Sequence, residues 1–165
     1  MKTAAKRERK TLRMVELALL LGAAVFLLSG IWALNTQRDL ADRVVRLHVL
    51  ANSDTEEDQA LKLLVRDAVL ERATEILEQS EDRESAEALL RESLPELEAL
   101  AQAEVQANGY DYAVTAELED TSFPTKEYDG FALPAGEYLA LRVLIGAAEG
   151  QNWWCVVFPS LCVPA

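Results

Sequence analysis

The sequence has few of the residues that most often carry catalysis or bind metals. It contains one histidine, His48, and two cysteines, Cys155 and Cys162. No second histidine or thiol lies near His48, so spacing suggests no nucleophilic triad. Two cysteines and one remote histidine are too few ligands for a zinc site. Glycine-rich phosphate loops and nucleophile elbows are also missing from the sequence. We therefore predict no catalytic residue, no metal and no cofactor.

Basic residues are scarce in most of the chain. Residues 35–165 hold 10 basic against 26 acidic side chains, a net charge of −16. Such a surface repels the phosphates of nucleic acids, so the sequence predicts no nucleic-acid partner. Ten of the acids fall within residues 75–104. We interpret them as solvated helix faces, with a docking surface for a basic partner as the alternative.

The N-terminal part has the opposite charge and contains the longest apolar run. Residues 1–13 have a net charge of +5, and the 18 residues of 17–34 include no charged side chain. A basic flank before such a segment keeps the N-terminus in the cytoplasm and sends the following chain across the membrane. A spanning helix needs about 20 apolar residues, and the apolar core of a cleaved signal peptide has about 7–15. We expect an uncleaved membrane anchor, with a cleaved signal peptide as the alternative. The predicted domains are therefore 1–34, a basic cytoplasmic flank plus a signal or transmembrane segment, and 35–165, one exported domain.

Alternation of apolar and polar residues predicts strands in the exported domain. In the first, at 44–50, Val45, Leu47 and Val49 face one side, and Arg46, His48 and Leu50 face the other. Further strands are expected in three other ranges, and the stretch 123–136 is rich in turn residues. These ranges are 112–119, 138–145 and 153–158.

Three helices are expected between the first two strands. Ser53 and Glu56 fit a capping box at the start of the first helix. The second begins near Asp82. The third begins at Ser93, because Pro95 suits a first turn and breaks a helix interior. The predicted fold is α+β: an N-terminal apolar helix, then one domain with about three helices on a mostly antiparallel sheet.

One short motif before the first predicted helix has a functional and a structural interpretation. Asn52, Asp54, Glu56 and Asp58 alternate like the first half of a calcium loop, but the glycine and the final glutamate of such a loop are missing. Helix capping explains them better.

Trp153 and Trp154 are adjacent, so on a strand they point to opposite faces. Either both are structural, or one is a binding anchor, as tryptophan often is at interfaces. Cys155 and Cys162 either form a disulfide in an oxidising compartment or remain free thiols.

Several stretches resemble the stage II sporulation protein R family. They include RLHVLANSD at 46–54, followed by EDQALK at 57–62. The later stretches are FPTKEY at 123–128, LPAGEY at 133–138 and NWWCV at 152–156. Together the resemblance covers roughly residues 44–165, and the helices at 72–107 match only in character.

This resemblance implies a non-enzymatic signalling protein of endospore formation. Such a protein is made in the forespore and exported across its membrane into the intermembrane space. There it activates a membrane-embedded aspartic protease of the mother cell, which cleaves the precursor of the early mother-cell sigma factor. The candidate partner-binding residues are Trp153, Trp154, Lys126 and Tyr128. The alternatives are a membrane-tethered extracytoplasmic hydrolase using His48 with Asp54 or Asp58, and a non-catalytic envelope structural protein.

Overall fold

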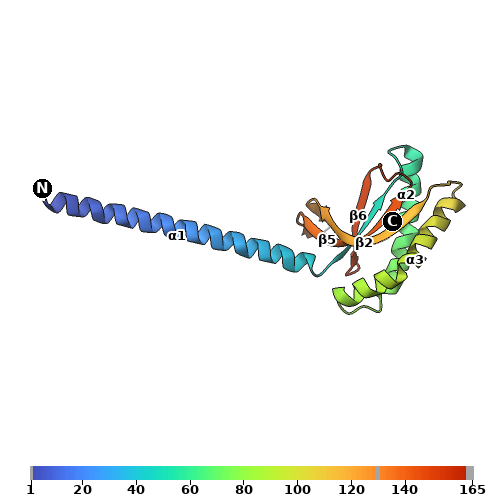
Figure 1. Ribbon diagram of the computed structural model, residues 1–165, viewed down its shortest axis with the longest axis horizontal. Helices are drawn as coiled ribbons and strands as arrows, with labels where there is room; N and C mark the ends of the chain where they lie inside the picture. Colours follow the sequence, from blue (N-terminus) through green and yellow to red (C-terminus); the bar gives the residue numbers. More distant parts are fainter. Residues whose placement is uncertain (1, 129–130, 163–165) are drawn as a thin grey trace. The chain divides into compact units, whose positions relative to one another are not determined.

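The computed structural model describes residues 2–128 and 131–162. Side chains are described at 14, 16–30, 32, 39–128 and 132–162. The chain forms two compact units, one ending at Asp39 and one beginning at Leu40. Figure 1 shows the elements of both.

The first unit consists of helix α1, Lys2–Ala41, whose last two residues belong to the second unit. Its described apolar side chains are exposed, Phe26 at 77%. Among the residues that the structure describes, no helix has both the length and the apolar character needed to cross a membrane. The predicted apolar segment 17–34 includes residues 31, 33 and 34, whose side chains lie outside the described ones.

The second unit is built on a four-stranded sheet in the order β2-β5-β1-β6. The central strands β1 and β5 are parallel, and each pairs with an antiparallel outer strand. The pairing places Arg46 opposite Ala140 on one side and Val156 on the other. The sheet is therefore mostly antiparallel. Its strands are β1 Val45–Leu50, β2 Val114–Phe123, β5 Gly136–Ile145 and β6 Asn152–Phe158.

Helices α2, Glu56–Leu77, and α3, Arg83–Ala107, pack on one face of this sheet. Their apolar stripes meet the inward side chains of β1, the set predicted from its alternation. Leu47, Leu90 and Leu97 are all fully buried in this core. The predicted α+β class, with helices on a mostly antiparallel sheet, is confirmed.

Two details of the predicted helices are wrong. Helix α2 is capped by Thr55, whose side chain accepts a hydrogen bond from the Asp58 amide, and not by Ser53. Helix α3 continues through Pro95, so two helices pack on the sheet in place of about three. An interior proline costs about 3 kcal/mol. Burial of Leu90 and Leu97 on the same helix face, on either side of the proline, offsets that cost.

Both outer strands of the sheet have partners along their outer edge. On β2, the amides of Val114 and Ala116 donate to the side chains of Gln102 and Glu98 of α3. On β6, the Val156 carbonyl accepts a hydrogen bond from the Leu161 amide. Each edge is thus partly covered by the chain itself.

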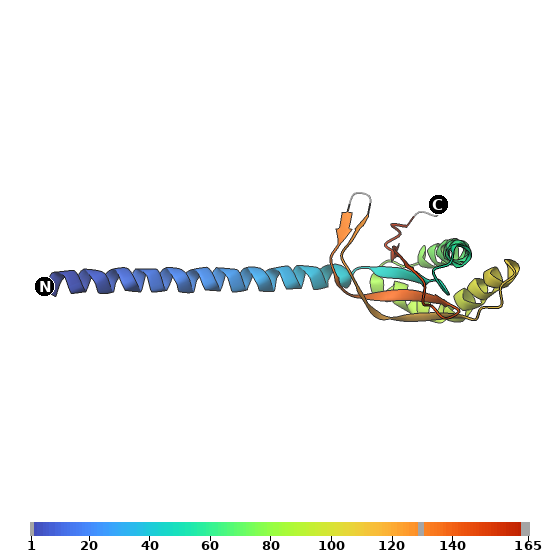
Figure 2. The same ribbon diagram turned by 90° about the horizontal axis from the view of Figure 1, so that it is seen from above.

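A small hairpin follows β2, within the stretch predicted as turns. Strands β3, Lys126–Tyr128, and β4, Phe131–Leu133, form a separate two-stranded sheet. Figure 2 shows this hairpin standing out from the end of the four-stranded sheet. Leu133 is buried and fixes the base of the hairpin in a second apolar cluster, which includes Phe123, Tyr138 and Val156.

Candidate functional site

The side of the sheet opposite α2 and α3 carries a concentration of aromatic and cationic side chains. We call it the aromatic face and define it by Arg46, His48, Phe123, Tyr138 and Trp154. Register explains the grouping, because His48 pairs with Trp154 and the parallel strands pair His48 with Arg142. Residues paired across strands project to the same side of a sheet.

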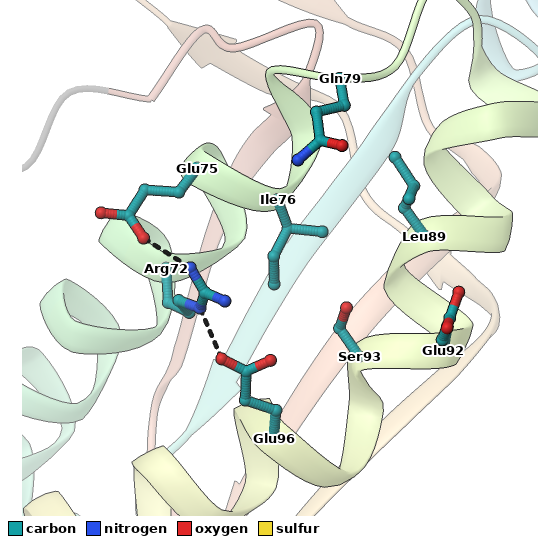
Figure 3. Close-up of a pocket in the computed structure, with 8 residues that line it drawn as sticks. All are labelled: Arg72, Glu75, Ile76, Gln79, Leu89, Glu92, Ser93 and Glu96. Carbon is teal, nitrogen blue, oxygen red and sulfur yellow. Dashed lines mark hydrogen bonds and ion pairs between the residues drawn. The ribbon is translucent and has the colours of Figure 1, made fainter.

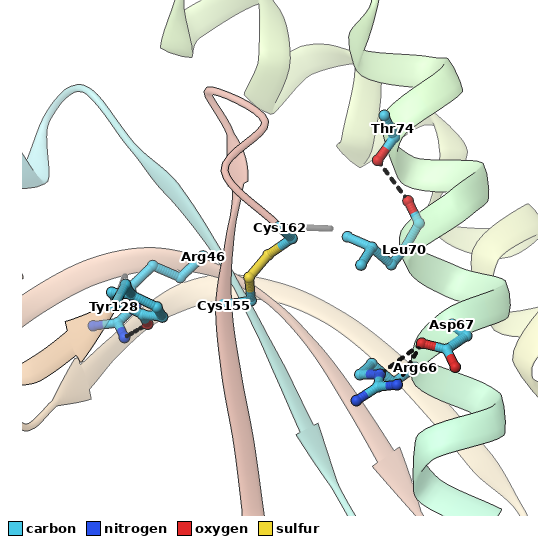
Figure 4. Close-up of a disulfide and its surroundings, with 8 residues drawn as sticks. All are labelled: Arg46, Arg66, Asp67, Leu70, Thr74, Tyr128, Cys155 and Cys162. Carbon is cyan, nitrogen blue, oxygen red and sulfur yellow. Dashed lines mark hydrogen bonds and ion pairs between the residues drawn. A yellow bond between two sulfur atoms is a disulfide. The ribbon is translucent and has the colours of Figure 1, made fainter. Parts of the chain in front are cut away.

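Arg46 is at the centre of the aromatic face and is fully buried. Its Cζ lies 3.8 Å from the centre of the Phe123 ring and 5.0 Å from that of Tyr138, in cation–π contact with both. Nη2 donates a 2.7 Å hydrogen bond to the Tyr128 hydroxyl (Figure 4). Nε and Nη1 have no hydrogen-bond partner among the described residues. Burial lowers the pKa of Arg46, against a smaller raising effect of Tyr128.

His48 lies next to Arg46 on the aromatic face and is buried. Its Nε2 lies 2.7 Å from the Asn152 amide oxygen, an acceptor, which assigns the ring proton to Nε2. Burial lowers the pKa of His48, and Arg142 lowers it further, while the Asn152 hydrogen bond opposes both. Asp54 and Asp58, the carboxylates of the hydrolase alternative, form hydrogen bonds with other groups: Asp58 with Asn52 and Ser53, and Asp54 with the Gln151 amide.

Three of the four predicted partner-binding residues gather at this face. Lys126 Nζ lies 5.9 Å from the centre of the Trp154 ring, and Tyr128 contacts Arg46. Trp154 is half-buried and Lys126 is exposed, so both are partly accessible. Trp153 lies on the opposite face, where it packs on the core and under Arg66, whose Cζ is 4.8 Å from its ring centre.

Sequence patterns alone assigned no binding role to Arg46 and Tyr138. A charged residue alternating with core residues on a central strand was the available signal for Arg46. The role of Arg46 depends on its contact with the β3–β4 hairpin, and the sequence pattern around Arg46 does not predict where that hairpin lies.

The two cysteines are joined in a disulfide with a Cα–Cα distance of 6.0 Å. Both are buried, and Figure 4 shows Cys162 beside Leu70 of α2. The bond connects the chain after β6 back to β6, one residue from Trp154. It therefore fixes the strand that presents this tryptophan.

Hydrogen bonds connect the polar loop before α2 to the turn between β5 and β6. Asp58 accepts hydrogen bonds from Asn52 and Ser53, at 2.8 and 2.5 Å. Asp54 accepts one from the Gln151 amide, at 2.7 Å. These contacts use three of the four side chains considered for calcium, those of Asn52, Asp54 and Asp58. Among the described residues, no three His, Cys, Asp or Glu side chains are placed to hold a metal ion.

A groove of about 400 Å³ lies between α2 and α3 (Figure 3). Arg72 bridges it, with Nε 2.6 Å from a Glu96 carboxylate oxygen and Nη1 2.7 Å from one of Glu75. Several of the acids of residues 75–104 therefore surround this groove, on the opposite side of the sheet from the aromatic face.

Comparison with known proteins identifies the family. A family model described as stage II sporulation protein R matches residues 41–165. Stage II sporulation protein R of Bacillus subtilis (strain 168) is 40% identical over 123 residues, 74% of this chain and 55% of that protein. The chain thus spans about half the length of this curated relative. No solved structure matches. The chain belongs to the stage II sporulation protein R family.

Proposed function

We propose that this protein is an exported sporulation signal made in the forespore. In this proposal it crosses the forespore membrane into the intermembrane space, where it is anchored or released by signal cleavage. It activates a membrane-embedded aspartic protease of the mother cell by binding to the extracytoplasmic face of that protease. The consequence is cleavage of the precursor of the early mother-cell sigma factor. Family membership supports the sporulation role, and the charge reversal around residues 17–34 supports export.

The aromatic face is the observation that carries the choice of binding surface. Family-like stretches from three distant parts of the chain meet there: Arg46 and His48, then Lys126 and Tyr128, then Trp154. A core alone has no need of a cation such as Lys126 beside a half-exposed tryptophan. Tryptophan and arginine are the residues that most often dominate interface energies.

Reconstituted cleavage tests this proposal. Residues 35–165 would be added outside vesicles that hold the protease, with the sigma precursor inside, and cleavage followed over time. We expect cleavage to depend on the added domain. Trp154→Ala should weaken the response about 30-fold, the equivalent of about 2 kcal/mol of binding energy. Lys126→Ala should weaken it less, because a rim charge contributes less.

Arg91 provides a matched control for the loss of a cation. It lies exposed on α3 and pairs only with Glu87 in the described part of the chain. Arg91→Ala should leave cleavage unchanged, and all variants should show the far-ultraviolet circular dichroism of the parent. A folded parent domain that elicits no cleavage would contradict the proposal. If the Trp154 and Arg91 variants elicit equal cleavage, the aromatic face is not the surface that binds the protease.

A further inference from the structure

Arg46 is a buried cation without a carboxylate partner among the described residues. The carboxylates of Glu117 and Glu119, on the same side of the sheet, both pair with Arg142. Proteins almost always pair a buried charge, because burying it alone is strongly unfavourable. The two unpartnered groups, Nε and Nη1, add the cost of unmade hydrogen bonds. Two cation–π contacts and one hydrogen bond hold the guanidinium, and they leave these two groups available to a ligand that accepts hydrogen bonds.

The β3–β4 hairpin provides the cover over this cation. Each of its strands has three residues, and the hairpin is not part of the four-stranded sheet. A two-stranded hairpin is marginally stable by itself. The hydroxyl of Tyr128 connects it to Arg46. Tyr128 also packs on the second apolar cluster. Shifting the hairpin about its base at Leu133 would break these contacts and open the guanidinium to a ligand.

We propose that the aromatic face is a receptor for a side-chain carboxylate in an acidic segment of the partner protein. The hairpin lifts, Tyr128 releases Nη2, and the guanidinium binds the carboxylate through two parallel hydrogen bonds. Phe123 and Tyr138 hold the guanidinium plane in place. Only the identity of the partner rests on the proposed function; the receptor itself does not.

Charge complementarity selects this occupant. The domain has a net charge of −16 over residues 35–165, and its surface repels acidic chains in general. At the aromatic face, however, Lys126 stands exposed beside Trp154 and adds a second cation to Arg46. An arginine fork fits a carboxylate in bidentate geometry, which a lysine does not. An acidic segment is therefore the chemistry that satisfies both cations.

Binding of a hexaglutamate peptide to the full chain in nonionic detergent tests the receptor without any protease. We expect saturable binding at peptide concentrations below about 1 mM, measured by calorimetry. Arg46→Met should weaken it at least about tenfold, and Arg46→Lys should weaken it less. Tyr128→Phe should strengthen it about threefold, because the hydroxyl no longer competes for Nη2. Arg91→Met, which removes an exposed cation elsewhere, should bind like the parent.

The opposite signs expected for Arg46 and Tyr128 separate a covered receptor from a structural contact. If Arg46→Met and Arg91→Met bind alike, the receptor is overturned. If Tyr128→Phe weakens peptide binding, the idea that the hairpin covers the receptor is overturned. Equal binding of inorganic phosphate at the same concentration overturns the assignment to a carboxylate. If Arg46→Met fails to fold, the binding measured for Arg46→Lys and Tyr128→Phe still tests the receptor. Peptide binding without precursor cleavage would contradict the proposed function and leave the receptor supported.

Discussion

The loop before α2 allows the consequence of one substitution to be worked out from its contacts. Asp58 is 4% exposed, and its carboxylate accepts hydrogen bonds from Asn52 and Ser53. Asn52 in turn accepts a 2.9 Å hydrogen bond from the Ala147 amide, in the turn between β5 and β6. Asp58 therefore orders two loops at once.

Replacing Asp58 by alanine removes the acceptor of both hydrogen bonds. A hydrogen bond to a charged group contributes about 1.5–3 kcal/mol. Water replaces part of the loss, because Ser53 lies near the surface, so we expect the free energy of unfolding to fall by about 2–4 kcal/mol. Urea unfolding of the full chain at neutral pH, followed by tryptophan fluorescence, measures this difference.

Glu57 provides the control for this substitution. It is an exposed acid in the same first helical turn. Glu57→Ala should cost only about 0.5 kcal/mol, the contribution of a charge at the positive end of a helix. Equal costs for the two substitutions would refute the role assigned to the Asp58 network.

The pH dependence provides a second test of Asp58. Burial alone raises its pKa, but hydrogen bonds from Ser53 and Asn52 outweigh burial and hold the pKa below its ordinary 3.8. The unfolded chain therefore takes up this proton at a higher pH than the folded chain. The contribution of Asp58 is fully present above pH 3.8 and is lost as the pH falls through the folded pKa. The difference between parent and Asp58→Ala should shrink in acid.

Three further predictions concern other parts of the domain. Gly150→Ala should cost about 1–3 kcal/mol in urea unfolding, because its Cβ would clash with the Ser53 carbonyl oxygen; a parent-like value would refute this close approach. The lowered pKa of His48 means that the unfolded chain protonates first, so stability should fall as the pH drops below 6.5. His48→Gln should remove that component, and an unchanged pH slope would contradict it. Reducing the disulfide between Cys155 and Cys162 should cost roughly 2.5 kcal/mol, as the Cys→Ser double variant should also show by thermal unfolding.

The strands could be predicted from sequence because half-buried strands alternate strongly. In β1, Val45, Leu47 and Val49 line the core face as the pattern indicates. Pro95 was misleading because local preference there opposes packing. Glu96, the residue after this proline, pairs with Arg72 of α2. Contacts between elements that are distant in the sequence determine whether the helix continues at such a position, and local sequence patterns do not reveal these contacts.

The candidate site was predictable only in part, for a similar reason. Trp154, Lys126 and Tyr128 were selected from residue type and family resemblance, and the fold brings them together. Adjacent tryptophans had to face opposite sides, but which one faced the core depends on the register of β6 against β1. Arg46 could not be selected in this way, because its hydrogen-bond partner lies in a hairpin about eighty residues later in the chain.

The covered outer strands have a consequence for how the protein behaves at high concentration. An open strand edge is a template on which another molecule's strand can pair, and it leads to aggregation. Here Glu98 and Gln102 already occupy two outward amides of β2, and Leu161 occupies a carbonyl of β6. These contacts oppose strand addition at both sides of the sheet. Glu98 and Gln102 thus hinder strand pairing between molecules, a role separate from their place in the helix.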